Sequence, residues 1–254
     1  MHNFKKKYGQ NFLRDENILN KIIDSFEVEK DGVIIEVGPG DGALTKKLLL
    51  KKTPVICFEI DDSLKSKLDL IKSDNLKIVY SDFLNINLND YIDKKVYFAS
   101  NVPYYITTPI INKFIKSNII PEVMIMMVQK EVAERLCSEP GNSEYGAISV
   151  ILDYYFDREY LFDVDRSCFY PIPNVDSSVI KLVKKDSVLK LKDYNKFVKI
   201  INDSFRMKRK NIRNNLKNYD LEKISSILKK YNLDLSNRAE EIDYEVFVDL
   251  ANNL

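Results

Sequence analysis

Histidine is almost absent from this chain of 254 residues, since the only one is His2, beside the amino terminus. A Ser-His-Asp triad, a Cys-His pair, an HExxH zinc site and a histidine general base all need an imidazole inside the fold. We therefore expect chemistry that proceeds without histidine and without a metal ion.

Cysteine and long apolar runs are scarce as well. The odd number of cysteines, Cys57, Cys137 and Cys168, without metal-ligand spacing, fits reduced thiols buried as small apolar side chains. The longest apolar runs are short ones such as 123–128, far below the roughly 20 residues needed to cross a bilayer. The basic amino terminus has no apolar stretch behind it and does not resemble a secretory signal. We expect a cytoplasmic protein with no membrane partner.

Glycine and proline are few, at 7 and 8 residues, and with 45% hydrophobic and 30% charged residues this excludes a collagen-like or disordered chain. The net charge is only +1, but residues 184–254 carry +5 and the rest of the chain −4. One run in this last part contains no acidic residue: Arg206, Lys208, Arg209, Lys210, Arg213 and Lys217. Such a run suits the phosphate backbone of a nucleic acid, and a solvated helix face is the alternative.

Short apolar runs alternate with segments of helical spacing. The runs predict buried strands at 33–37, 55–60, 77–80, 96–100 and 123–128. The intervening patterns predict helices at 42–51, 62–71, 108–117 and 129–137, after an opening helix near 16–25. This alternation predicts an α/β fold with a mostly parallel, doubly wound, Rossmann-like sheet.

The last third of the chain has a different pattern. Additional strands are expected within 146–183, although 148–156 is also compatible with a helix. From 184 onward the pattern is charged and helical, which predicts a small helical domain. We therefore predict a first domain at 1–183 and a second at 184–254.

Three motifs at the predicted strand ends describe a nucleoside pocket. The first strand runs into GPGDG at 38–42, where Gly38 and Gly40 let the backbone approach a ligand closely. The loop lacks the third glycine of the dinucleotide fingerprint and the Lys-Ser/Thr of a P-loop, and a plain turn is the alternative. Glu59 follows Gly38 by 21 residues, a distance typical of an acid that binds ribose hydroxyls, and Asp82 could accept a bond from an adenine amine or be a surface residue. Acids without nearby cations suit an adenosine that carries a positive sulfonium.

A fourth motif, Asn101-Val102-Pro103-Tyr104, follows the fourth predicted strand. The exocyclic nitrogen of adenine is a poor nucleophile because its lone pair is delocalised into the ring. The Asn101 side-chain oxygen and the Val102 carbonyl, held extended before Pro103, could each accept one N–H of that amine and aim its lone pair at a methyl group. Tyr104 would stack on a flipped base. An Asn-Pro turn with a packing tyrosine is the alternative.

Longer segments around these residues read YGQNFLRD (8–15), EVGPGDGALT (36–45), NVPYYITTPI (101–110), QKEVAERL (129–136), YGAISV (145–150) and FYPIPNVDSSVIKL (169–182). Together they resemble the ribosomal RNA adenine N6,N6-dimethyltransferases, and most closely the bacterial small-subunit branch, whose loss gives kasugamycin resistance. The resemblance implies S-adenosylmethionine as donor, S-adenosylhomocysteine as product, and dimethylation of two adjacent adenosines near the 3′ end of 16S rRNA in the 30S subunit.

The resemblance also implies roles for individual residues. It places these residues at the cofactor: Asn11, Leu13, Gly38, Gly40, Glu59, Ile60, Asp82, Phe83 and Asn101. Phe169 would be the second aromatic face around the flipped adenine, opposite Tyr104, whereas without the resemblance it reads as a core residue. The charge distribution, and not the resemblance, makes Lys5, Lys6 and Lys7 candidate phosphate ligands together with the basic run from Arg206 to Arg213 and Lys217. Two residues depart from the family pattern, Val102 in place of Leu and Tyr105 in place of Asn.

Two other functions remain open at this point. One is the related antibiotic-resistance branch, which methylates one adenosine of 23S rRNA. The other is a ribosome-assembly binding factor in which catalysis is secondary. The sequence leaves the oligomeric state open, and a monomer is the default expectation.

Overall fold

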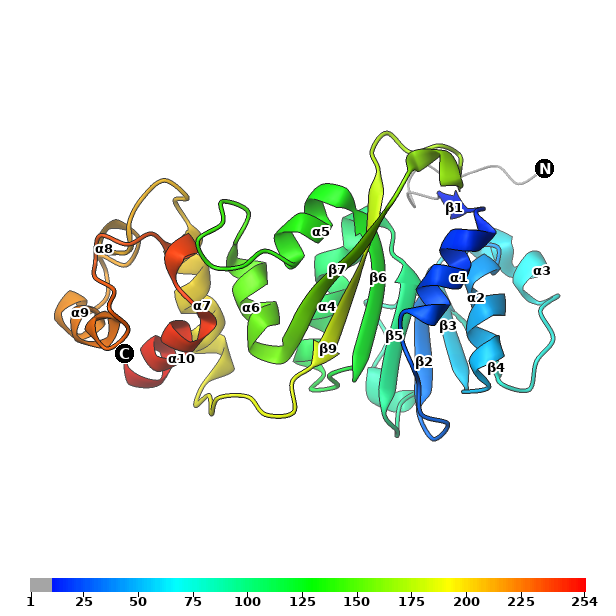
Figure 1. The fold of residues 1–254 in the computed structure, drawn as a ribbon. Coiled ribbons are helices and arrows are strands. Elements are labelled where there is room, and N and C mark those ends of the chain that lie inside the picture. Colours follow the sequence, from blue (N-terminus) through cyan, green and yellow to red (C-terminus); the bar gives the residue numbers. More distant parts are fainter. Residues whose placement is uncertain (1–10) are drawn as a thin grey trace. The chain divides into compact units, whose positions relative to one another are not determined.

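The strands that the apolar runs predict form the centre of a seven-stranded sheet in the computed structural model of the protein, which describes residues 11–254. The five parallel strands are β2 (Val33–Val37), β3 (Val55–Glu59), β4 (Leu76–Tyr80), β5 (Val96–Asn101) and β6 (Val123–Gln129). All five residues of β2 and of β3 are buried, as expected for strands that are covered on both faces. The order β4-β3-β2-β5-β6-β9-β7 places β2 inside the sheet (Figure 1).

Helices cover both faces of this sheet. On one face α1 (Glu16–Asp24) and α2 (Ala43–Leu48) pack in a core cluster that includes Tyr97 and Ala99 of β5. The residue between them, Phe98, points to the other face and meets Phe114 of α4 (Thr107–Lys116) edge-on, with 5.5 Å between ring centroids. Since successive side chains of a strand alternate between faces, these contacts confirm the doubly wound α/β fold. Shorter helices, α3 (Lys65–Leu68) and α5 (Lys130–Leu136), follow β3 and β6.

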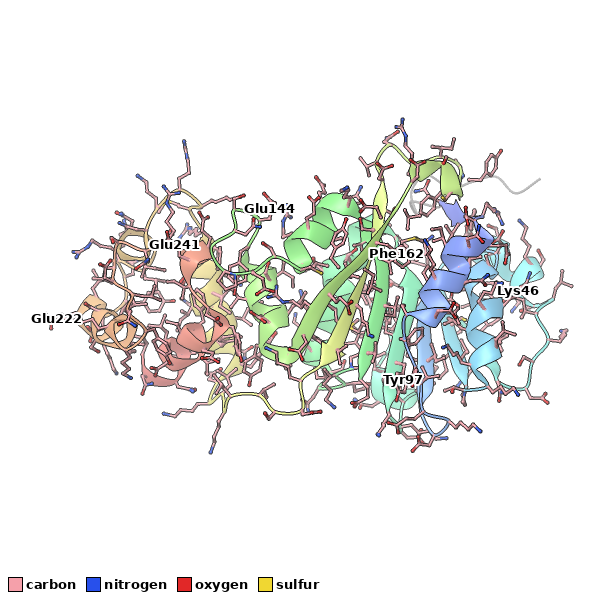
Figure 2. The ribbon with its side chains drawn as sticks, viewed as in Figure 1. Lys46, Tyr97, Glu144, Phe162, Glu222 and Glu241 are labelled. Atoms are coloured by element: carbon pink, nitrogen blue, oxygen red, sulfur yellow. The ribbon has the colours of Figure 1, made fainter. Side chains whose placement is uncertain are left out.

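Two further strands extend the sheet, as expected for 146–183. β9 (Ser177–Lys184) pairs antiparallel with β6, and β7 (Phe156–Val164) forms the edge. Phe162 of β7, labelled in Figure 2, has its ring 5.6 Å from the Nζ of Lys21 on α1. Within 147–155 the strand expectation is wrong, because Ala147–Tyr155 is helix α6. Its residues are apolar on nearly all sides, so periodicity could not separate the two alternatives.

A two-stranded sheet that the sequence did not predict lies beside the large one. β1 (Phe12–Leu13) pairs antiparallel with β8 (Phe169–Tyr170), which joins residues more than 150 positions apart. The register sets Phe12 opposite Tyr170 and Leu13 opposite Phe169.

The chain divides into two compact units, one of residues up to 133 with 159–184, and one of 134–158 with 185–254. The second unit is helical, as predicted, with α6 joined by α7 (Tyr194–Phe205), α8 (Ile212–Asn215), α9 (Leu221–Lys229) and α10 (Tyr244–Asn253). The expected boundary placed 134–158 in the first domain. The structure groups it with the second because α6 packs on the later helices, with the Tyr154 ring 5.3 Å from that of Phe197.

Most helices of the second unit have a side-chain cap at the amino end. Asp193, Asp220 and Asp243 accept backbone N–H bonds at the starts of α7, α9 and α10. Each cap satisfies a donor that the helix leaves unpaired and places negative charge at the positive end of the helix dipole. Within residues 11–254, no helix has the length and apolarity to cross a bilayer.

Candidate functional site: a pocket at the strand ends

The carboxyl ends of β2, β3, β4 and β5 border one pocket in the first unit. All nine residues predicted at a cofactor line it: Asn11, Leu13, Gly38, Gly40, Glu59, Ile60, Asp82, Phe83 and Asn101. Val102 and Pro103 of the predicted catalytic motif line it as well. Open α/β sheets bind ligands at this edge, where the strand order reverses.

The glycine loop forms one wall of the pocket. Gly38 and Gly40 have φ values of 70° and 63°, a left-handed conformation that favours glycine. A Cβ atom on Gly40 would lie 2.6 Å from the ring of Phe12, so the loop and β1 can approach only because this side chain is missing. The loop is held to the next strand by the Gly38 N–H, which donates to the Phe58 carbonyl at 2.9 Å.

Glu59 is an acid fixed in place at the end of β3. Its side chain accepts hydrogen bonds from the backbone N–H of Gly40 at 3.2 Å and of Asp61 at 2.8 Å, one on each oxygen. The residue is only 4% exposed, and burial raises the pKa of its carboxyl, against the lowering effect of these bonds. Each carboxylate oxygen has a second lone pair, so Glu59 can accept further bonds from a ligand.

Asp82 and Phe83 follow β4 at the pocket edge. The two oxygens of Asp82 accept bonds from the Leu84 N–H at 2.9 Å and from the Asn85 side chain at 3.0 Å. The Phe83 ring is 3% exposed and meets Phe58 edge-on at 5.3 Å. The pocket thus has an oriented acid beside an apolar wall, a combination that suits a flat heterocycle with an amino group.

The Asn101 amide is oriented by a contact with the amino-terminal segment. Its Nδ2 donates to the backbone carbonyl of Asn11 at 3.0 Å, so the side-chain oxygen is the acceptor available to a ligand. Next to it, the Val102 N–H donates to the Met127 carbonyl at 3.1 Å, which ties the motif to β6. Pro103 has φ −54° and ψ 128°, an extended conformation.

Sequence reasoning missed a buried acid under the glycine loop. Glu36 is 1% exposed and accepts bonds from the Thr45 hydroxyl at 2.6 Å and from the Cys57 thiol at 3.3 Å. Burial raises its pKa to about 7. The available signal was an acidic residue in the otherwise apolar strand VIIEV. Cys57 is fully buried, as expected, whereas Cys137 and Cys168 are only partly buried, contrary to the expectation.

Three more residues line the pocket although the sequence predicted no role there for them. Phe12 and Asp41 line the pocket, and Asp41 pairs with Arg14 at 2.5 Å. Tyr105 also lines it, with 55% of the residue exposed. Among the pocket-lining residues that the structure describes there are acids but no lysine or arginine. Within 11–254, no cluster of His, Cys, Asp and Glu could hold a metal ion.

The structure does not bring Phe169 to the pocket wall. Phe169 is 3% exposed and belongs to the core cluster that contains Leu13, its partner in the β1–β8 pair. Tyr170, on the opposite side of the strand, is 55% exposed. For Tyr104 only the backbone is described, in the short 3₁₀ turn at 104–106.

The predicted basic run lies in the second unit. Arg206, Lys208, Arg209 and Lys210 are exposed in the loop between α7 and α8, Arg213 is exposed on α8, and Lys217 is exposed just after it. Lys5, Lys6 and Lys7 lie outside the described residues.

Known proteins resemble the chain over its full length. The model of the family described as ribosomal RNA adenine dimethylase matches residues 1–254. A relative from Mycoplasma mobile, named ribosomal RNA small subunit methyltransferase A, is 42% identical over 248 residues, which covers 97% of this chain and 96% of the relative. A protein of the same name from Fusobacterium nucleatum is 41% identical over 253 residues, with the same coverages.

Two solved structures share the fold over both units. A dimethyladenosine transferase from Plasmodium falciparum superimposes with a TM-score of 0.81 at 25% identity, covering 94% of this chain and 95% of that one. The 23S rRNA methyltransferase ErmE gives a TM-score of 0.74 at 26% identity, with coverages of 96% and 99%. The match to the family model over every residue decides the assignment: this chain is a methyltransferase that belongs to the ribosomal RNA adenine dimethylase family.

Proposed function

We propose that the protein dimethylates the N6 amines of two adjacent adenosines near the 3′ end of 16S rRNA, within the small ribosomal subunit. The observation that carries this proposal is the 42% identity, over 97% of the chain, to a protein named small subunit methyltransferase A. The reaction takes place in the cytoplasm, where small subunits assemble, and the enzyme acts as a monomer.

S-adenosylmethionine, when bound, supplies an electrophilic methyl group on a positive sulfonium. The residues of the strand-end pocket fit this donor, because acids line the pocket and the glycine loop brings backbone close. Glu59 accepts bonds from the ribose hydroxyls with the lone pairs that Gly40 and Asp61 leave available. Asp82 binds the adenine amine against Phe83 and Ile60, and Gly38 faces the methionine part.

Asn101 and Val102 orient the amine that receives the methyl group. The Asn101 oxygen accepts one N–H of the adenine, since the bond from Nδ2 to Asn11 turns the oxygen to that role. The Val102 carbonyl accepts the other. Catalysis is then orientation and electrostatic complementarity rather than proton removal by a strong base. Tyr104 stacks on the target base, and the role of Phe169 as a second face stays a prediction.

The exposed cations of the second unit bind RNA phosphates without reading sequence. Their charge is available to a partner, because the cations from Arg206 to Lys210 form no ion pair among residues 11–254. Lys5, Lys6 and Lys7 complete the proposed phosphate contacts.

Methyl transfer from labelled S-adenosylmethionine to unmethylated small subunits tests the proposal, with naked 23S rRNA as the parallel substrate. We expect label in small subunits, mapped to two adjacent dimethyladenosines of 16S rRNA. Label in 23S rRNA alone would assign the protein to the resistance branch, which the likeness to ErmE keeps as the second candidate. Tight subunit binding with no label in either substrate would make it a binding factor instead.

A further inference from the structure

The loop that joins α7 to α8, residues 206–210, is the most densely charged segment of the second unit. We call it the basic loop. All five of its residues are exposed, and four of them are cations: Arg206, Lys208, Arg209 and Lys210. Like charges this close repel one another, and within 11–254 no acidic side chain forms an ion pair with any of them. Repulsion alone would favour an open, disordered loop.

One asparagine side chain opposes that tendency. The Oδ1 of Asn215 accepts the Met207 N–H at 3.2 Å. Its two Nδ2–H groups are shared among three backbone carbonyls, those of Ser204 at 2.7 Å, Met207 at 3.3 Å and Lys210 at 3.2 Å. Within the loop, the Lys210 N–H donates to the Met207 carbonyl at 2.9 Å. A single amide therefore contacts the last turn of α7 and two residues of the basic loop, Met207 and Lys210.

Asn215 itself stands on a rigid base. It is the last residue of α8, whose Ile212 is fully buried and whose first turn is capped by the Asn211 side chain. The backbone N–H groups of Ile212 and Arg213 donate to the carbonyls of Asn237 and Leu235, at 2.9 and 3.1 Å. The position of the amide is thus set by the core of the second unit and not by the loop it holds.

We propose that Asn215 is a positioning residue that keeps the basic loop preorganised for the phosphates of the substrate RNA. An ordered loop binds with less loss of conformational entropy than one that must be ordered on contact, while the number of charges stays the same. The inference rests on the proposed function, because it takes ribosomal RNA as the partner of this loop.

The test compares Asn215→Ala with Asn218→Ala, which changes an exposed asparagine in the next turn of chain. We measure affinity for unmethylated small subunits over a range of salt concentrations. Asn215→Ala should bind about tenfold more weakly at each salt concentration, with an unchanged slope of log affinity against log salt, because every cation remains. Asn218→Ala should match the unsubstituted chain. Equal affinity of Asn215→Ala and Asn218→Ala would overturn the proposal. A flatter slope of log affinity against log salt for Asn215→Ala would overturn it too, because a flatter slope indicates lost phosphate contacts.

Limited trypsin digestion separates loop ordering from general stability, since the loop offers four cleavage sites. Cleavage within 206–210 should be faster in Asn215→Ala at a temperature where circular dichroism shows both variants folded. Unchanged cleavage would overturn the proposal.

Should Asn215→Ala fail to fold, hydrogen exchange on the unsubstituted chain gives the answer. The Met207 N–H should be protected from exchange before any RNA is added. Exchange at the rate of an unstructured peptide would contradict the proposal. Methylation of small subunits by the same unsubstituted protein is the separate readout of the proposed function, so either can fail alone.

Discussion

The strand-end pocket and the basic loop handle charge in opposite ways. Pocket acids such as Glu36 and Glu59 are almost fully buried, and each accepts hydrogen bonds from the protein itself. The cations of the basic loop are exposed, and only the backbone between them is held. Buried groups act over short distances with little screening, whereas exposed charges are screened by salt. Donor binding in the pocket should therefore depend on geometry and pH, and RNA binding at the basic loop on ionic strength.

Asn101→Ala should give the largest effect, and it affects only the pocket. Loss of the oxygen that orients the amine should lower the rate of methyl transfer by about a hundredfold or more. Binding to small subunits should stay unchanged, because the basic loop is intact. Labelled transfer and subunit pull-down measure the two quantities, with Asn75→Ala, an exposed residue, as the control. Near-normal turnover of Asn101→Ala would show that the proposed amine contacts are wrong.

A variant of Glu36 tests whether burial sets the pKa of an acid in the pocket. Because its folded pKa of about 7 exceeds the ordinary value of 4.5, the native state holds its proton more tightly than the unfolded chain does. The contribution of Glu36 to stability is therefore full below pH 4.5, and falls by about 3 kcal/mol as the pH rises to 7. Chemical denaturation from pH 4.5 to 7 should show a shallower fall for Glu36→Gln than for the unsubstituted chain. Parallel curves would mean that Glu36 ionises normally.

Glu59→Gln should weaken binding of S-adenosylmethionine by about tenfold, because a neutral amide is a poorer acceptor for ribose hydroxyls than a carboxylate. Calorimetric titration measures the affinity. Glu122→Gln, which changes a partly exposed acid that precedes β6 and pairs with Lys184, is the matched control. Equal affinities for the two variants would remove Glu59 from the donor site.

Neutralising Arg206, Arg209 and Lys210 together should leave donor binding untouched and change only the salt response of RNA binding. The slope of log affinity against log salt should flatten by about 0.7 to 0.9 for each RNA phosphate that the protein no longer neutralises. Subunit binding at several salt concentrations checks this prediction. An unchanged slope would place the RNA contacts elsewhere, and a change in donor affinity would contradict the division between pocket and loop.

Much of the fold could be predicted from local patterns. The five parallel strands agree with the predicted ranges to within one residue at either end, because an apolar run buried on both faces is readable in the sequence. The pattern over 147–155 is compatible with a strand as well as with a helix, because its apolar residues lie on nearly all sides of the helix axis. The antiparallel β1–β8 pair left no signal, because each strand has only two residues.

The candidate site divides in the same way. Gly38, Glu59, Asp82 and Asn101 could be grouped in advance, since the ends of parallel strands meet at one edge of a sheet. For Phe169 the residue by itself predicts a core position and the resemblance predicts a position at the target base. The sequence could not decide between the two, because the β1–β8 register sets which of two adjacent aromatic rings faces the core. The role of Asn215 could not be predicted either, because it is one asparagine among several in a polar segment.

The sequence by itself determined the α/β class, the helical second unit, the family and the residues that meet at the strand ends, because these follow from local periodicity and from motifs. Only the tertiary structure decided which way the Asn101 amide turns, how far the pKa of Glu36 rises and what holds the basic loop. Each of these depends on contacts between segments separated along the chain, such as the 90 positions between Asn11 and Asn101. Burial and hydrogen bonding of that kind exist only once the chain has folded.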